Sequence, residues 1–239
     1  MNKLLLLWAI FAPLLLLAQK TSGTAEYKLM LKKSKNTEMK GAYQNDIDEI
    51  AKQALNFRFE LVFDKHASLF SLIRNLPFNK NSFSTKMAIT IFDGDKTYFT
   101  NLNENYLIER KQVLGEQFQV KLDFDHHDWK FANEKKTILG YECFKAIGKR
   151  IRLTKSFETI ETELVAWYCP ELPFRTGPFE AVGLPGMVLQ LDLKGRSVVM
   201  TDLVFKDQGL IENPMNGQTI TQKEFDSIYE KRIKAKLPR

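Results

Sequence analysis

The stretch WYCPELPFRTGPFEAVGLPGMVLQLDL, residues 167–193, decides the fold, because its two parts follow different sequence rules. Four prolines and three glycines divide the first part, up to residue 186. Proline fixes φ and glycine reaches backbone angles closed to other residues, so this part follows a defined, non-repetitive path. From Met187 to Leu193 every second residue is Met or Leu, which is the period of a half-buried strand. The pattern therefore predicts a stiff turn at 183–186 that leads into a core strand.

Short motifs in and before this stretch resemble a known family. They are ILGYECFKA (138–146), AWYCPELP (166–173), GP (177–178) and GLPGMVL (183–189). In this order they are similar to the GLPGLI family of exported bacterial envelope proteins, whose activity is not established. The resemblance covers about a third of the chain, with Met187 where the name-giving motif has Leu, a swap of similar volume. The family-motif positions are Gly140, Tyr141, Cys143, Trp167, Pro173, Gly177, Pro178, Gly183, Leu184, Pro185 and Gly186.

The N-terminus has the pattern of a signal peptide, which we place at residues 1–18. Lys3 supplies the positive start, an apolar run follows over residues 4–17, and Ala18 is a small residue at the expected cut before Gln19. A membrane anchor is the alternative, but Pro13 and a run shorter than the ~20 residues of a spanning helix argue against it. We therefore expect a single exported domain, 19–239, in the periplasm or outer envelope of a Gram-negative-type bacterium. It is not expected to be an integral membrane protein.

Composition excludes some classes of partner. The chain is 44% apolar with 18 Phe, which is ample for a core, and its formal net charge is +6. Lys and Arg are scattered among Asp and Glu along the sequence instead of gathering into a stripe. A nucleic-acid-binding surface is therefore not expected.

Periodicity predicts a mainly β protein. Strands are expected at 27–31, 55–63, 67–73, 86–92, 96–102, 106–113, 118–124, 137–147, 162–168, 187–193 and 197–205. Asp46 and Glu49 predict the start of a short helix. The strands at 86–92 and 96–102 are expected to form a hairpin through Asp93-Gly94. Thr221 and Glu224 predict a C-terminal helix with one apolar side.

Short connections favour antiparallel pairing, so we expect one large, curved antiparallel sheet with one or two short covering helices. A half-open barrel like that of the lipoprotein carriers is a fold-level analogy for this arrangement. A β-sandwich is the second choice.

Residues 123–128 hold the only cluster that resembles a metal site. Asp123, Asp125, His126, His127 and Asp128 could bind zinc if their side chains converged. Neighbouring residues of a strand point to opposite faces, so both imidazoles would reach one ion only at a turn. We favour a polar loop and expect no metal and no cofactor.

Cys143 and Cys169 are the only cysteines. Because the chain is expected to be exported to an oxidising compartment, we favour a disulfide between them. The alternative is two buried, small apolar residues, since a sequence does not show whether their Cα atoms lie close enough. A nucleophilic role is disfavoured because no histidine is near either cysteine in the sequence.

Three functions stay open. The first is a noncatalytic envelope protein that binds an apolar ligand, a lipid-like molecule or a peptide in the concavity of its sheet. The expected lining is aromatic and apolar: Trp129, Tyr141, Trp167, Tyr168, Phe174, Phe179 and Leu184. The second is an envelope hydrolase or metal-dependent enzyme built on 123–128, although no GxSxG, HExxH or phosphate-binding glycine motif is present. The third is a structural partner of an outer-membrane assembly.

Overall fold

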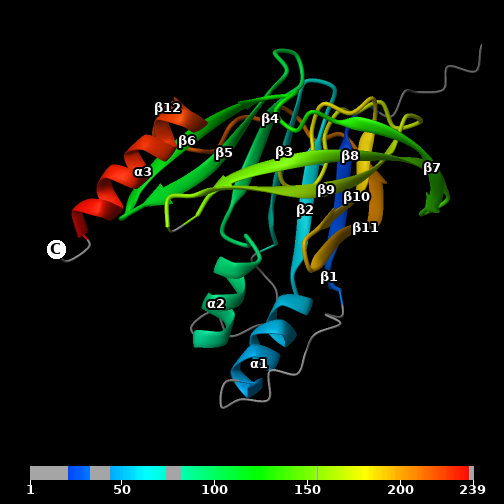
Figure 1. The fold of residues 1–239 in the computed structure, drawn as a ribbon. Helices are drawn as coiled ribbons and strands as arrows, with labels where there is room; N and C mark the ends of the chain where they lie inside the picture. Colours follow the sequence, from blue (N-terminus) through cyan, green and yellow to red (C-terminus); the bar gives the residue numbers. More distant parts are fainter. Residues whose placement is uncertain (1–20, 33–43, 74–81, 155, 237–239) are drawn as a thin grey trace, which may run out of the picture.

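The computed structural model describes residues 21–32, 44–73, 82–154 and 156–236, so the predicted signal peptide lies outside the described residues. This part of the chain forms strands and three helices (Figure 1). The strands are β1 (Gly23–Leu31), β2 (Arg58–Phe63), β3 (Ala67–Leu72), β4 (Thr97–Asn101), β5 (Tyr106–Val113), β6 (Glu116–Asp123), β7 (Lys130–Ile138), β8 (Tyr141–Leu153), β9 (Thr159–Cys169), β10 (Met187–Leu193), β11 (Arg196–Phe205) and β12 (Gln218–Thr221). The helices are α1 (Gln44–Leu55), α2 (Phe83–Ile91) and α3 (Gln222–Lys236).

All these strands belong to one open sheet, in the order β12-β6-β5-β4-β3-β2-β1-β11-β10-β9-β8-β7. Neighbouring strands are antiparallel, except that β12 runs parallel to β6 at one edge. The predicted large β sheet is therefore confirmed, with a parallel edge that the prediction lacked. The sheet is not closed into a barrel, and it is one sheet rather than the two of a sandwich.

The sheet is curved so that parts far apart in the strand order meet. Figure 1 shows β8 and β9 passing across β5 and β6, with α3 beside β6 and β12, while α1 and α2 lie together below the sheet. Phe157, in the turn between β8 and β9, contacts Tyr229 of α3 with ring centroids 6.4 Å apart. The curvature leaves an interior that the chain itself must fill.

The proline-rich stretch between β9 and β10 fills much of this interior. Phe179 is 1% exposed and packs against Phe59, Phe70 and Tyr98, with ring centroids 5.3, 5.1 and 5.8 Å away. Phe174, five residues earlier, contacts Phe63 at 4.6 Å. Burial of several aromatic rings in edge-to-face contact is a large favourable contribution to folding. The stretch is therefore core, although it has no regular secondary structure.

The turn at 183–186 is confirmed, and its glycines are required by space. A Cβ added to Gly183 would lie 2.3 Å from the carbonyl oxygen of Phe124, and one added to Gly186 would lie 2.1 Å from that of Cys169. Both glycines have positive φ, and Leu184 between them is buried. Strand β10 begins at Met187, directly after the turn.

The predicted strand at 86–92 is wrong, because residues 83–91 form α2. Ser82 caps this helix: its hydroxyl accepts a hydrogen bond from the amide of Thr85 at 3.1 Å. Buried Thr85 and Ala88 share the inner side, three residues apart, which is a helical spacing. The prediction rested on the hairpin-like composition around Asp93-Gly94 and did not consider the serine cap before residue 83.

Two boundaries also differ from the prediction. Helix α1 begins at Gln44, so Asp46 lies inside its first turn and is not the capping residue. Residues 137–147 are not one strand: Leu139 and Gly140, both with positive φ, form the turn that joins β7 to β8. The capping box of α3 is confirmed, since Thr221 and Glu224 exchange hydrogen bonds of 2.7 and 3.2 Å.

We predict that Gly186→Ala destabilises the fold strongly, because the new methyl group would collide with the backbone at Cys169. Gly140→Ala is the matched control, since Gly140 also has positive φ but nothing lies within 4 Å of an added Cβ. It should cost only the ~1–2 kcal/mol of left-handed backbone strain, and Gly186→Ala clearly more. Chemical denaturation of both variants measures the difference. Equal losses would show that the close approach at Gly186 does not limit the fold.

Candidate functional site

The interior of the curved sheet contains charge as well as aromatic rings. Eight side chains are joined by ion pairs into what we call the ion-pair network: Asp93, Lys96, Glu109, Lys111, Arg150, Arg152, Glu180 and Arg196. They come from the turn after α2 and from β5, β8, β11 and the proline-rich stretch. Five cations and three carboxylates give the network a formal charge of +2.

Asp93 is the centre of the network. Its Oδ2 accepts from Nη2 of Arg196 at 2.5 Å and of Arg152 at 3.4 Å, and its Oδ1 lies 3.2 Å from Nζ of Lys96. The guanidinium of Arg150 is 3.9 Å away. Asp93 has φ of 59°, a left-handed conformation that Asp adopts more readily than most residues. The tight turn after α2 therefore directs this carboxylate into the network.

Two glutamates extend the network to either side. Glu109 on β5 lies 2.7 Å from Nζ of Lys96 and 3.1 Å from Nζ of Lys111. Glu180 pairs through Oε1 with Nε of Arg150. Glu180 directly follows Phe179. One segment therefore packs the Phe179 ring into the aromatic core and places the Glu180 carboxylate in the ion-pair network.

The acids of the network are ionised. Burial alone would raise the pKa of Asp93, but the charges of Lys96, Arg152 and Arg196 outweigh it and hold the pKa below its usual range. Burial likewise opposes ionisation of Glu180, but the charges of Arg150 and Arg152 outweigh it and lower the pKa of Glu180 to about 2. Neither group is therefore poised as a general acid near neutral pH.

A groove of about 480 Å³ opens on one side of Arg150 and Arg152. We call it the basic groove, because its lining combines five cations with one carboxylate and several apolar side chains. Its cations are Lys32, Arg150, Arg152, Lys194 and Arg196; its carboxylate is Glu163; its apolar side chains are Leu31, Ile91, Phe92, Ile160, Leu164 and Leu193. It thus offers positive charge beside an apolar wall.

A smaller pocket of about 290 Å³ lies on the other side of the two arginines, between β5, β8 and α3. We call it the histidine pocket, because His126 and His127 line it together with Glu180. The imidazole rings lie with centroids 3.8 Å apart, and burial lowers the pKa of His127 to about 4. The polar sequence 123–128 is thus a turn that directs both imidazoles inward.

The weak metal candidates do not assemble into a site. Within the described residues, no group of three or more His, Cys, Asp or Glu side chains is arranged to hold a metal ion. Asp125 and Asp128 are exposed, whereas His127 is 2% exposed. The second of the predicted functions therefore has no donor set at 123–128.

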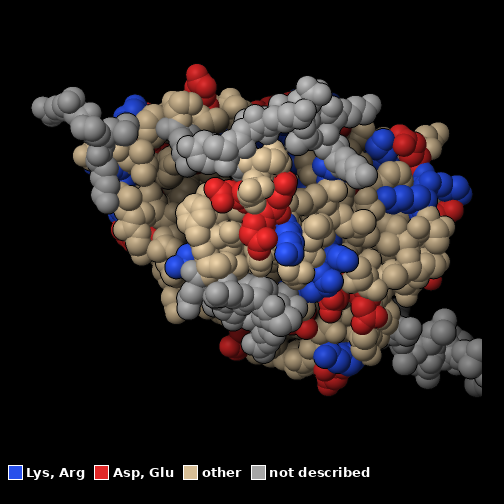
Figure 2. All heavy atoms as spheres, turned by 90° about the horizontal axis from the view of Figure 1, so that it is seen from below, with Lys and Arg blue, Asp and Glu red and all other residues tan. Residues whose placement is uncertain are grey.

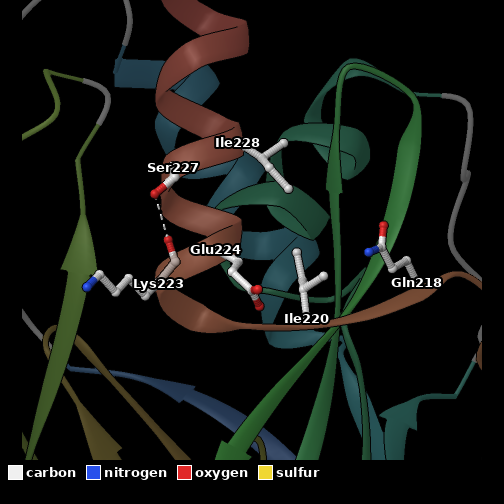
Figure 3. Close-up of a pocket in the computed structure, with 6 residues that line it drawn as sticks. All are labelled: Gln218, Ile220, Lys223, Glu224, Ser227 and Ile228. Carbon is white, nitrogen blue, oxygen red and sulfur yellow. Dashed lines mark hydrogen bonds between the residues drawn. The ribbon is translucent and has the colours of Figure 1, made fainter.

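A third hollow lies at the junction of β12 and α3 (Figure 3). Its lining is Gln218, Ile220, Lys223, Glu224, Ser227 and Ile228. In Figure 3 the hydroxyl of Ser227 donates to the carbonyl of Lys223 at 3.0 Å, and Glu224 belongs to the capping box. These polar groups already have partners within the helix end, so the hollow offers little for a ligand to recognise.

The seven aromatic and apolar residues expected to line a ligand site lie in or beside the core. Phe174, Phe179 and Leu184 lie in the core, and none of the seven lines the basic groove or the histidine pocket. Trp129 donates to the carbonyl of Val182 at 2.9 Å and so holds the proline-rich stretch in place. Three others contact the core at its margin or lie in it: Tyr141, Trp167 and Tyr168. Their participation in binding stays an untested prediction.

Sequence reasoning missed the basic groove, although a signal was present. Arg150 and Arg152 are two residues apart on β8, which places both on one face of the strand. Asp93, with which both arginines pair, was predicted only as part of a hairpin turn. Figure 2 shows Lys and Arg interspersed with Asp and Glu on the lower face of the molecule, in line with the scattered charge of the sequence.

The predicted disulfide is wrong. Cys143 and Cys169 are both free and fully buried. Cys143 precedes Phe144 on β8, and Cys169 follows Tyr168 on β9. Phe144 and Tyr168 are paired across these two strands. Burial raises the pKa of Cys143 to about 12, so its thiol is protonated and unreactive. The alternative, two small buried residues of the core, describes them.

Comparisons with known proteins give a family match over part of the chain and a similar fold. A family described as a protein of unknown function (Porph_ging), the GLPGLI family, matches residues 152–190. Over these residues the chain matches the GLPGLI family. The matched segment runs from Arg152 of the network through β9 and the proline-rich stretch to Gln190 of β10. No curated protein matches the sequence.

Two solved structures of PNGF-II, in space groups C2 and P21, have a similar fold. They superpose with TM-scores of 0.51 and 0.52 at 15% sequence identity and cover 89% and 88% of this chain. This chain spans about a third of PNGF-II, 32% and 34% of the two structures. At this identity the similarity concerns the fold alone.

Within the described residues, no helix has the length and apolar character needed to cross a bilayer.

We predict that Asp93→Asn destabilises the protein by ~3–5 kcal/mol, because it removes the carboxylate shared by four buried or half-buried cations. Chemical denaturation at neutral pH measures the loss. The control is Glu161→Gln, which removes an exposed ion pair with Lys149 and should leave stability nearly unchanged. If Asp93→Asn were as mild as the control, the network would not hold the interior together.

We also predict that stability falls as the pH is lowered from about 7 to about 5. The pKa of His127 is about 4 in the folded protein and near the usual 6.5 in the unfolded chain, so the unfolded chain binds more protons in this window. The expected loss from His127 is on the order of 2 kcal/mol. Denaturant melts at both pH values measure it, and His127→Gln should flatten the dependence. A wild-type protein equally stable at both pH values would contradict the prediction.

Proposed function

We propose that this protein is a noncatalytic binding protein of the bacterial envelope that takes up an anionic amphiphile in the basic groove. An amphiphile of this kind has a carboxylate or phosphate head and a hydrocarbon chain. The observation that carries the proposal is the lining of the groove, in which five cations and one carboxylate stand beside six apolar side chains. This develops the expectation of a lipid-like ligand and moves it from the aromatic residues of the core to the groove.

The charge of the groove favours an anion. The groove is lined by five cations and one carboxylate, and the ion-pair network that supplies three of these cations has a formal charge of +2. An uncompensated positive charge in a partly buried site attracts an anion more strongly than it would in bulk water. The Arg152 side chain is 39% exposed and, among the residues that the structure describes, forms an ion pair with Asp93 alone, so most of its five N–H donors are available there. Arg152 is therefore the expected contact of the head group.

The apolar wall favours a hydrocarbon chain. Ile91 and Ile160 are 50% and 45% exposed, and both line the groove. Covering such side chains contributes roughly 25 cal/mol per Å² of apolar surface removed from water. The guanidinium centre of Arg196 is 5.6 Å from the centroid of the Phe92 ring, and Nη1 of Arg196 donates to the carbonyl oxygen of Ile91 at 3.1 Å. The apolar wall and the cationic groups are thus adjacent, as a head and a tail are in one molecule.

The other two candidate functions have less support. The histidines at 123–128 have no metal donor set around them within the described residues, and the carboxylates of the network stay ionised. A purely structural partner would need no groove that combines charge with an apolar wall. Export, with removal of residues 1–18, remains part of the proposal. Native mass spectrometry of protein from the envelope fraction would report the mass of the mature chain and any amphiphile it retains.

We predict that laurate binds the protein and that Arg152→Gln weakens this binding about tenfold or more, because a charge-assisted hydrogen bond contributes ~1.5–3 kcal/mol. Isothermal titration calorimetry below the micelle concentration measures the affinity. The control variant is Lys149→Gln, since Lys149 is exposed, pairs with Glu161 and does not line the groove. It should bind laurate as the wild type does.

Dodecyl maltoside supplies the matched ligand control, because it carries the same chain length on a neutral head. We expect it to bind more weakly than laurate. Equal affinity for both would mean that the cations of the groove do not select the ligand. No measurable binding of laurate would refute the proposed function.

A further inference from the structure

The histidine pocket is separate from the basic groove and carries an inference of its own, which does not rest on the proposed function. It is enclosed by the turn at 123–128, by β5 and β8, and by the start of α3. The pocket has a volume of about 290 Å³, and its lining combines charged and polar side chains with Leu122, Ile151 and Leu153.

Both imidazoles line this pocket, and their protonation can be assigned from their hydrogen bonds. Nδ1 of His126 lies 2.5 Å from the carbonyl oxygen of Asp123, and Nδ1 of His127 lies 2.9 Å from that of Lys149. A carbonyl oxygen only accepts, so Nδ1 of each ring carries the proton and donates it. Burial lowers the pKa of both groups, so the second nitrogen is unprotonated at neutral pH. Nε2 of each ring is then a hydrogen-bond acceptor.

Three acceptors of the pocket have no donor. Nε2 of His126, Nε2 of His127 and Oε2 of Glu180 are buried and make no hydrogen bond within the described part of the chain. His127 and Glu180 are 2% and 4% exposed. A buried polar atom left without a partner costs about 1–3 kcal/mol, and native proteins keep few of them. Three in one pocket indicate that a bound molecule supplies the donors.

The charge of the pocket favours a neutral molecule. Its lining contains three cations, Lys111, Arg150 and Arg152, and three carboxylates, Glu109, Glu180 and Asp226. A cation would meet the two guanidinium groups, and an anion would meet the ionised glutamates. A neutral group that both donates and accepts fits these walls, since it can donate to the imidazoles and accept from the arginines. A hydroxyl group has this property.

We propose that the histidine pocket is a binding site for a small, neutral, polyhydroxylated molecule, with hydroxyl groups donating to Nε2 of His126, Nε2 of His127 and Oε2 of Glu180. The cations of the same lining, Lys111, Arg150 and Arg152, donate hydrogen bonds to the oxygen atoms of these hydroxyls. The basic groove, by contrast, takes an anion. Arg150 and Arg152 line both spaces and divide one from the other.

Long-range proton–nitrogen correlation NMR of the imidazoles tests this directly, because the chain has 3 His and therefore few signals. myo-Inositol is the probe. We expect unprotonated Nε2 signals from His126 and His127 that shift in a saturable way as inositol is added. His66 is the internal control, since it is exposed and bonds Asn103 on a distant turn, and its signals should not move. If the signals of all three histidines did not shift, the proposal would be overturned and the pocket would hold only water.

Two further arms separate chemical class and site. Gluconate, a polyhydroxylated anion, should bind more weakly than inositol; equal or tighter binding would overturn the assignment of a neutral ligand. His126→Phe removes one acceptor and should weaken inositol binding about tenfold, whereas His66→Phe should not. Lys194→Gln, in the lining of the basic groove, should leave inositol binding unchanged, because Lys194 does not line the histidine pocket. A loss with Lys194→Gln equal to that with His126→Phe would place the probe in the groove and overturn the proposal.

Discussion

The packing of Phe179 and Glu180 inside the curved sheet is the interaction on which the rest of the structure depends. Phe179 lies among the rings of β2, β3 and β4, while Glu180 pairs with Arg150 on β8. Phe179 has φ of 55°, a conformation that costs ~1–2 kcal/mol for a residue with a Cβ. This conformation persists because the core holds the ring of Phe179 and Arg150 holds the carboxylate of Glu180. Two halves of one sheet are thereby fastened to one irregular segment.

Because of this arrangement, the chain itself fills much of the concave side of the sheet. A curved open sheet suggests an empty apolar hollow, yet the proline-rich stretch occupies the middle with buried aromatic and aliphatic side chains. What remains open lies on either side of Arg150 and Arg152. The two spaces differ in charge because the carboxylates of the network are unevenly placed: Glu109 and Glu180 face the histidine pocket, and Asp93 lines neither space. One network therefore creates two chemically different sites.

The segment matched by the GLPGLI family contains much of this arrangement. It includes Arg152, Glu180 and the turn at 183–186, which together connect the network to the core. PNGF-II shares the fold over about a third of its length. A fold does not specify a function, so what this chain binds must be argued from its own groove and pocket.

Local pattern determined much of the secondary structure from sequence alone. The alternation of 187–193, the capping box at Thr221 and Glu224, and the rigid GLPG turn all correspond to the structure, because each is set by neighbouring residues. Residues 86–92 were predicted as a strand but lie largely in α2, because a short apolar run fits a strand or a helix and packing decides between them. Tertiary structure alone decided the sites. Asp93, Glu109, Arg150, Glu180 and Arg196 are far apart in sequence, and ion pairing between such residues depends on the register and curvature of the whole sheet, not on any local spacing.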